Sequence, residues 1–474
     1  MSNIGLIAKN EIRSLVNGMR FRILFVLNLI LILISSIGGY IAYKSIKRER
    51  QAAELEVRAS WLNQEEKNPH SAAHYGTFVY RPKSILSFFD FGVDAYVGNS
   101  IYLEAHRQND SKFSAASESS SNIRFGEMSL AFILQVLVPL MIIFLGFNLV
   151  TQEKEGKTLR LVLSQGIELR QVAWGKIIGL YSTVIMLVLP AFLVLLFVGN
   201  SKLDLDTNKD LYQRLTLISL FYFFYYFLFS AISIYVSSRS TSSRSALLSL
   251  LGFWILICLL LPKITANIGV SLNRAPSAFE FRQAIAKDEE NGIDGHNPAD
   301  KRFDRLKDSI IKVYKVSRVE ELPINFNAVA MQEGEKYSSM IYNKHFNNLK
   351  QSYQKQNLVS AYASLLNPYL AIRNISMALS GTDMLTAIEF DRQAENYRFQ
   401  MVEYLNNYLR DFSLTGEWDK KASKDIYKGV PEFQFQSITV LSVIKNNLIV
   451  ILSFISWLAL LFILINRLSD QKNS

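Results

Sequence analysis

Three histidines in the N-terminal part of the chain have the residue type and spacing to bind a metal ion. His70 and His74 are four residues apart, and His106 follows with Glu104 close to it in the sequence. Imidazole nitrogens suit a borderline-soft divalent ion such as zinc, and ligands four residues apart share one face of a helix. A proline and a glycine bracket the first pair, however, so we do not expect a regular helix there. Histidines in folded loops commonly form hydrogen bonds with backbone groups, so the sequence predicts no metal site. If a metal ion does bind, these three residues are the candidate ligands.

Other kinds of chemistry find little support in the chain. No Ser/His/Asp or Cys/His set has a spacing that suggests a nucleophile, so we expect no catalytic residue. Gly156-Lys157-Thr158 has the letters that end a phosphate-binding loop, but Thr151 stands where that loop needs its first glycine. The sequence therefore predicts neither a nucleotide site nor a cofactor in this chain.

Six apolar stretches predict that the chain is a membrane protein. Half of all residues are hydrophobic, and a charge-free apolar run of roughly 18 residues is the length that a helix needs to cross a bilayer core. Backbone groups in lipid must bond within the chain, which makes such runs helical. The predicted membrane helices are residues 23–43, 128–150, 177–199, 215–236, 246–262 and 448–465.

The distribution of charge predicts which side of the membrane each loop faces. Lys and Arg accumulate in short cytoplasmic loops. With the N-terminus inside, four segments are cytoplasmic and carry almost the whole net charge of +10, so nucleic acid is not expected as a partner. Both termini are then cytoplasmic. The four segments are residues 1–22, 151–176, 237–245 and 466–474.

Residues 44–127 and 263–446 then form two domains outside the cytoplasm. The chain has a single cysteine, so no disulfide within it can stabilise either domain, and each is expected to have its own hydrophobic core. Residues 44–63 continue the first membrane helix as a charged helical run, and residues 263–446 have mostly helical patterns. Residues 1–22 place apolar and basic residues at helical spacing, which predicts an interfacial helix or, alternatively, a charged lead-in to the first span.

The predicted cytoplasmic loop 151–176 has the most informative residue pattern. It contains, in order, an acidic pair, Thr-Leu, Leu-Ser, a basic residue and Gly-Lys, which are Glu153, Glu155, Thr158, Leu159, Leu163, Ser164, Arg170, Gly175 and Lys176. This order resembles the signature loop of ABC-2 type permeases. The glycine that the family has before Thr-Leu is shifted to Gly156, so Lys157 stands where that glycine is expected. Parts of the predicted outer domains, among them Asn68-Pro69-His70-Ser71 and Asn367-Pro368-Tyr369, look like a large-ectodomain subfamily of uncharacterised function.

The resemblance implies an all-α membrane protein with six transmembrane helices of ABC-2 (type V exporter-like) architecture and two mainly helical extracytoplasmic domains. It implies a place in the bacterial cytoplasmic (inner) membrane, surrounded by membrane lipid. In this family the loop docks into a separate ATPase subunit, which holds ATP and Mg²⁺. A second permease subunit, either another copy or a related chain, completes the path of an exporter. The residues that the resemblance assigns to coupling are Glu153, Glu155, Lys157, Thr158, Leu159 and Leu163.

Aromatic residues crowd the fourth predicted span. Tyr222, Tyr225, Tyr226 and Phe229 are candidates to line an apolar substrate path, and packing against lipid or other helices is the alternative interpretation.

Two other functions compete with ATP-driven export. A secondary transporter usually has ionisable groups within its spans, and these six spans have none. A membrane-anchored module whose outer domains bind or sense a ligand remains open as the alternative function.

Overall fold

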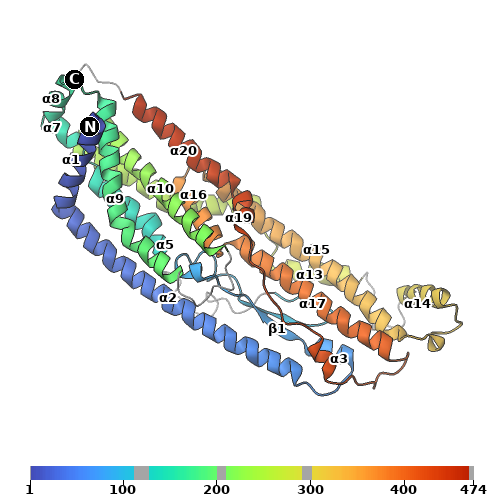
Figure 1. Ribbon diagram of the computed structural model, residues 1–474. Coiled ribbons are helices and arrows are strands. Elements are labelled where there is room, and N and C mark those ends of the chain that lie inside the picture. The colour runs from blue at the N-terminus through green and yellow to red at the C-terminus, as the bar shows by residue number, and fades with distance from the viewer. Residues whose placement is uncertain (1, 111–127, 200–209, 291–300, 469–474) are drawn as a thin grey trace.

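The computed structural model is an elongated helical protein (Figure 1). Helix α1 (Asn3–Asn17) and the C-terminal end of α20 (Leu448–Asn466) lie at one end of the molecule, which we call the terminal end. Helices α3 (Pro69–Tyr75) and α14 (Lys301–Tyr314) lie toward the other end, which we call the distal end. The structure describes residues 2–110, 128–199, 210–290 and 301–468, so parts of the predicted segments 44–127, 263–446 and 466–474 lie outside the described residues.

Among the residues that the structure describes, six helices are long and apolar enough to cross a membrane, which confirms the number predicted from the sequence. Each extends beyond its predicted bounds at one end or both, because flanking polar residues continue the helix. The first three are α2 (Met19–Leu62), a run of α5 (Leu130–Phe132), α6 (Val138–Gly146) and α7 (Thr151–Glu155), and α9 (Leu169–Gly199). The others are α10 (Leu211–Arg239), a run of α11 (Ser243–Trp254) and α12 (Leu261–Leu272), and α20.

Helix α2 is far longer than a single crossing requires. Its 44 residues, at 1.5 Å each, make a helix about 66 Å long, whereas a hydrocarbon core is about 30 Å thick. The apolar half ends near Tyr43, and a charged half continues to Leu62. The helical run predicted after the first span is therefore confirmed, and it carries the chain from the terminal end toward the distal end (Figure 1).

Two π-helical segments interrupt the spans. Ile133–Leu137 joins α5 to α6, and Ile255–Leu260 joins α11 to α12. Each is followed closely by a proline, which has no N–H and leaves a carbonyl of the preceding turn without its helical partner. Side chains from other parts of the chain supply the missing hydrogen-bond donors. Asn367 Nδ2, for example, donates to the Ile257 carbonyl at 2.9 Å. An interior without water requires this pairing, because an unpaired buried carbonyl is costly.

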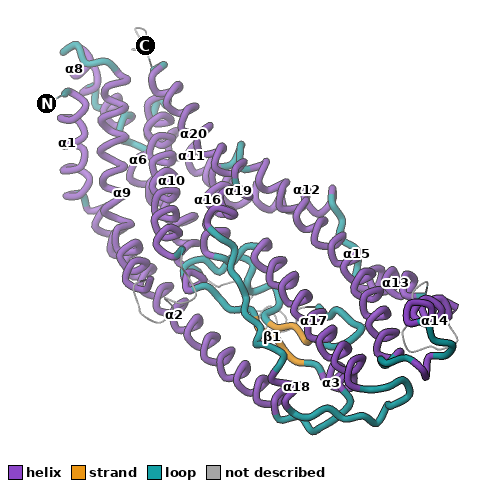
Figure 2. Tube along the Cα trace, turned by 45° about the vertical axis from the view of Figure 1, so that its right-hand side comes forward, coloured by secondary structure: helices purple, strands orange, loops and turns teal. Residues whose placement is uncertain are grey.

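The distal part combines long helices with a small sheet. Strands β1 (Thr77–Tyr80) and β2 (Ser100–Leu103) pair antiparallel, and Figure 2 shows them beside α17. Beyond α2 and the short helix α3, the described part of segment 44–127 thus consists of two strands, a 3-10 turn and loops, whereas the resemblance implied a mainly helical domain. The remaining elements are 3-10 turns at Ile85–Phe88 and Val319–Glu321, α8 (Thr158–Ser164), α13 (Ala278–Glu289), α15 (Phe326–Ala363), α16 (Pro368–Ser380), α17 (Met384–Phe412), α18 (Asp425–Lys428) and α19 (Val440–Asn446).

The two segments predicted as separate outer domains contribute to one hydrophobic cluster. Trp61 and Leu103 from the first segment pack with Phe390, Leu405 and Tyr427 from the second. The indole Nε1 of Trp61 donates to the Tyr427 carbonyl at 3.1 Å, which fixes the contact. The described residues of the first segment are too few to build a large core alone, so each segment completes the other.

Helix α16 belongs to the predicted outer segment 263–446 but packs among the membrane-length helices. It contacts α10 and α20, and its buried face joins the main hydrophobic cluster of the spans. Asn367 caps its first turn by accepting from the Tyr369 N–H at 2.9 Å. The sequence placed this helix wholly outside the bundle because its mixed composition hides a buried apolar face.

Candidate functional site

Helices α7 and α8 form a short helical hairpin at the terminal end, next to α1 (Figure 1). They occupy the loop in which the sequence placed the six coupling residues. Gly156 and Lys157 join them, and the Lys157 backbone has φ 60° and ψ 5°. This left-handed conformation costs a residue with a side chain about 1–2 kcal/mol. Lys157 thus stands at a position at which the backbone favours glycine.

A lysine of α9 ties the hairpin to α1. Lys176 Nζ lies 2.7 Å from Glu153 Oε1 and 2.9 Å from Glu11 Oε2, and its side chain is only 4% exposed. One buried cation of α9 therefore holds two carboxylates, one from α1 and one from α7. Glu11 was not among the candidates from the sequence. It is the one acidic residue in residues 1–22, a segment that also contains four Lys and Arg residues.

Two glycines of α9 let α1 pack closely against it. A Cβ atom added to Gly175 would lie 2.6 Å from the Cβ of Ile7, and one added to Gly179 would lie 2.6 Å from the Cβ of Glu11. Small residues four apart allow membrane helices to approach in this way. Residues 1–22 therefore contain the predicted helix, and the surface that the helix packs on is α9.

The second predicted cytoplasmic loop, 237–245, is bonded to the first. Glu155 accepts hydrogen bonds from the Ser243 N–H at 2.7 Å and the Ser243 hydroxyl at 2.9 Å. Lys154 Nζ donates to the backbone carbonyls of Ser238 and Ser240. Hydrogen bonds and ion pairs thus connect the two loops with each other and with the ends of the adjoining helices. We call this connected set of side chains the polar layer.

The two leucines among the six predicted coupling residues, Leu159 and Leu163, differ in how far they are buried. Leu159 is only 6% exposed and packs into the core of this chain, so it is not available to a partner. Leu163 is half-buried, whereas Leu161, which was not among the six, is 65% exposed. Lys157, Thr158 and Arg160 beside it are exposed. The outward face of α8 is therefore an exposed leucine with polar and basic residues around it.

The four aromatic residues proposed for a substrate path are buried inside this chain. Tyr222, Tyr225 and Tyr226 are 0% exposed and Phe229 is 1% exposed. Tyr225 donates to the Gln135 carbonyl at 2.8 Å, in the π segment that precedes a proline. These side chains pack the interior and satisfy backbone groups, so they line no open path in this structure, and the packing interpretation describes them.

The structure brings the three candidate histidines together. His70 Nε2 lies 3.1 Å from His74 Nε2 and 3.4 Å from His106 Nε2. Contrary to the expectation from its flanking residues, the first pair lies on a regular helix, α3. The proline, Pro69, is at the first helical position, where its missing N–H costs nothing, and Gly76 ends the helix with φ 65°.

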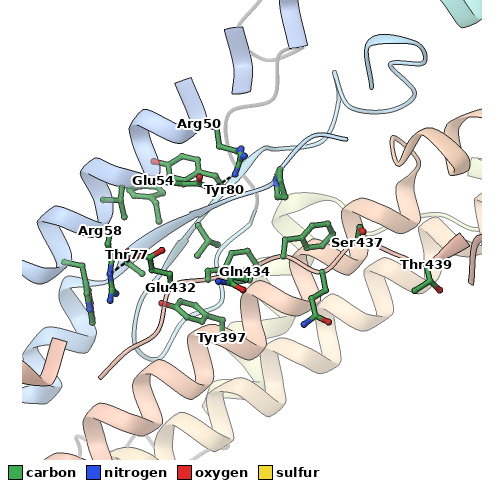
Figure 3. A pocket seen from close by; sticks show the side chains of 18 of the residues that line it. Arg50, Glu54, Arg58, Thr77, Tyr80, Tyr397, Glu432, Gln434, Ser437 and Thr439 are labelled. Atoms are coloured by element: carbon green, nitrogen blue, oxygen red, sulfur yellow. Dashed lines mark hydrogen bonds and ion pairs between the residues drawn. The ribbon is translucent and has the colours of Figure 1, made fainter. Parts of the chain in front are cut away.

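A second feature of the distal part is a cavity of about 820 Å³ between α2, β1, α17 and residues 432–439 (Figure 3). Arg50, Arg58 and Tyr397 are among the side chains that line it. Arg58 Nη1 donates to the Val430 carbonyl at 2.9 Å, and Tyr397 donates to the Pro431 carbonyl at 2.7 Å. Burial raises the pKa of Tyr397 to about 12, so its hydroxyl keeps its proton. The volume falls in the range of small-molecule sites.

A family model matches part of the chain. Residues 278–436 match the family described as a domain of unknown function, DUF3526. No curated protein matches the chain. The matched region runs from α13 to the segment that follows α18, and it excludes the α7–α8 hairpin. The match therefore marks residues 278–436 as a unit that occurs in a family of unknown function, and its activity is left to be argued from the structure.

Proposed function

We propose that this chain is the membrane-spanning permease subunit of an ATP-driven exporter of the ABC-2 type. The observation that carries the proposal is the α7–α8 hairpin, which lies at one end of six membrane-length helices and has an exposed leucine among basic residues. The terminal end faces the cytoplasm, where the excess of Lys and Arg belongs. The distal part lies outside the cytoplasm.

The docking partner is a separate ATPase subunit that holds ATP and Mg²⁺. An apolar side chain inside a polar rim is the composition of a small protein interface. Leu161 supplies the apolar contact, and Lys157, Thr158 and Arg160 supply the rim. A second permease subunit, identical or related, completes the transport path.

The polar layer behind α8 supports transmission of movement from the docked ATPase to the spans. A displacement of α7 pulls on Lys176 of α9 through Glu153 and on α11 through Ser243. Because Lys176 also holds Glu11, helix α1 moves with them. Glu153 and Glu155 thus act as links within this chain rather than as contacts to the ATPase.

Copurification with the ATPase tests this proposal. The full-length protein is purified from its native membrane in mild detergent, and associated ATPase is identified by mass spectrometry and by ATP hydrolysis. Leu161→Glu is expected to lower the recovered ATPase at least about tenfold, as loss of a central contact of about 1.4 kcal/mol or more would. Val313→Glu is the matched control, because Val313 is 69% exposed but lies at the distal end.

A result without ATPase would favour the alternative function. If the unchanged protein brings down no ATPase, or if both variants retain it equally, docking through α8 is wrong. The cavity of about 820 Å³ favours the alternative, a membrane-anchored module that binds a ligand outside the cytoplasm. In that case Arg58→Ala is expected to abolish ligand-induced stabilisation of the purified protein, because Arg58 lines the cavity.

A further inference from the structure

Three imidazole rings converge on one point at the distal end. Their facing nitrogens are Nε2 atoms, at 3.1 Å between His70 and His74 and 3.4 Å between His70 and His106. One ligand nitrogen from each of the three rings lies within 4.8 Å of the others. With zinc–nitrogen bonds of about 2.0–2.1 Å, a tetrahedral ion would hold its ligand nitrogens about 3.3–3.4 Å apart. The two separations from His70 Nε2 are close to that geometry.

The opposite ring nitrogens contact hydrogen-bond acceptors from the other segment. His70 Nδ1 lies 3.0 Å from Asn406 Oδ1, and the Asn406 amide is oriented by donating to Gln332 Oε1 at 2.9 Å. His106 Nδ1 lies 3.3 Å from Glu335 Oε2. An acceptor at Nδ1 makes that nitrogen the donor, so a neutral ring directs its lone pair from Nε2 toward the other two rings. A metal-ligating histidine commonly has this arrangement, with the second ring nitrogen bonded to an acceptor.

The backbone that carries these rings is held firmly. Asn68 caps α3 by accepting from the His70 N–H at 2.9 Å. His106 has φ 62°, a left-handed conformation that is uncommon for a residue with a side chain. Its N–H donates to Glu335 Oε2 at 2.7 Å, and Glu335 in turn pairs with buried Arg398. Strain maintained by a buried network is typical of functional sites.

The access to the cluster is asymmetric. His70 is buried and His106 half-buried, whereas His74 is exposed. A fourth coordination position beside His74 would therefore face solvent. Three protein ligands and one open position are the arrangement of zinc sites that bind water or an exogenous ligand.

We propose that His70, His74 and His106 bind one zinc ion through their Nε2 atoms, with a fourth position open to water or to a ligand from solvent. The three ligands come from segment 44–127, and the orienting groups Asn406 and Glu335 come from segment 263–446. The ion would therefore stabilise the contact between the two segments. This site is independent of the exporter proposal, because it needs no ATPase.

Metal binding to the full-length protein in detergent tests the site. The protein is stripped with a chelator, dialysed, and titrated with zinc in competition with a chromophoric chelator. One equivalent is expected to bind, and His74→Ala and His106→Ala are each expected to weaken binding at least about a hundredfold. His345→Ala is the matched control, since His345 pairs with Asp288 at 2.9 Å outside the cluster. Thermal melting without metal checks that each variant is folded.

A second pair of variants distinguishes orientation of a ligand from general stability. Asn406→Leu removes the acceptor at His70 Nδ1 and is expected to weaken zinc binding about 10–100-fold, whereas Asn406→Asp keeps an acceptor there and is expected to restore it. Cobalt bound in place of zinc is expected to give the intense visible absorption of a four-coordinate site. Failure to bind zinc, equal loss in His345→Ala, or the weak spectrum of six-coordinate cobalt would each overturn the proposal.

Discussion

Arg398 is expected to be the most sensitive position for the stability of the distal part. Its guanidinium is 1% exposed and lies 2.8 Å from Glu395 and 2.5 Å from Glu335, whose side chains are 6% and 0% exposed. Although burial alone would lower the pKa of Arg398, the hydrogen bonds and charges of Glu395 and Glu335 raise it above the usual value, so the side chain stays charged. Arg398→Met leaves two buried carboxylates without a cation, which costs about 3–5 kcal/mol.

The same helix provides a matched control for this prediction. Arg392 pairs with Glu389 three residues earlier in α17, with nitrogen–oxygen distances of 2.9 and 2.6 Å. Arg398 pairs with Glu395 at the same spacing, at 2.8 Å for both contacts. The Arg392 side chain differs in being 57% exposed, and Arg398 also pairs with a second carboxylate, Glu335. Arg392→Met is therefore expected to cost only about 0.2–1 kcal/mol.

Hydrogen–deuterium exchange of the full-length protein in detergent measures both effects. Amides of α15 and α17 report the free energy of opening of the distal part. Arg398→Met is expected to lower this free energy by about 3–5 kcal/mol, and Arg392→Met by less than about 1 kcal/mol. Equal effects of the two variants would refute the argument, because burial would then not determine the value of the ion pair.

Three further predictions concern other parts of the chain. Lys157→Gly is expected to raise the free energy of opening of the α7–α8 hairpin by about 0.5–1 kcal/mol, because glycine adopts the left-handed backbone conformation without steric strain. Hydrogen exchange measures this free energy, and a decrease would contradict the prediction. Burial raises the pKa of Asp90, so stability is lost as the pH rises from the usual Asp pKa to the raised one. Asp90→Asn is therefore expected to raise the melting temperature at alkaline pH and to change it little in acid, and an equal change at both pH values would rule out this cause. Gly179→Leu is expected to displace α1 and to speed its proteolysis, and protection of α1 in this variant would argue against close packing on α9. Gly252→Leu is not expected to have this effect, because a Cβ atom added to Gly252 would meet nothing within 4 Å apart from its chain neighbours and the backbone of its own helix.

Local sequence patterns predicted the long helices well. Apolar runs without charge identify the six membrane-length helices, because length and hydropathy alone decide them. The helix over residues 44–63 is predicted as a charged helical run, and α17 lies in segment 263–446, for which mostly helical patterns are predicted. Helix α3 is not predicted, because proline and glycine commonly interrupt helices, although at the first position of a helix proline has no bond to lose.

Contacts between distant residues could not be predicted. The pairing of Lys176 with Glu11 and Glu153, and the shared cluster that joins Trp61 to Tyr427, depend on how the helices pack and not on local spacing. His70 and His74 are related by their spacing, and His106, with Glu104 as the alternative, by its residue type and its place in the same predicted domain. Their orienting groups carry no signal of that kind, because they lie in a segment far along the chain.

The hydrophobic cluster that joins the two segments has a consequence for folding during synthesis of the chain. Trp61 is separated by 366 residues from the carbonyl that it bonds to, so at about 5–20 residues per second a ribosome needs about 20–70 seconds to supply that partner. During this interval the sheet and α3 have no completed core, and their apolar side chains stay open to other contacts. Truncated or stalled chains are therefore expected to be recognised by chaperones or degraded. Synthesis of the residues around Tyr427 is then the step that allows the distal hydrophobic cluster to form.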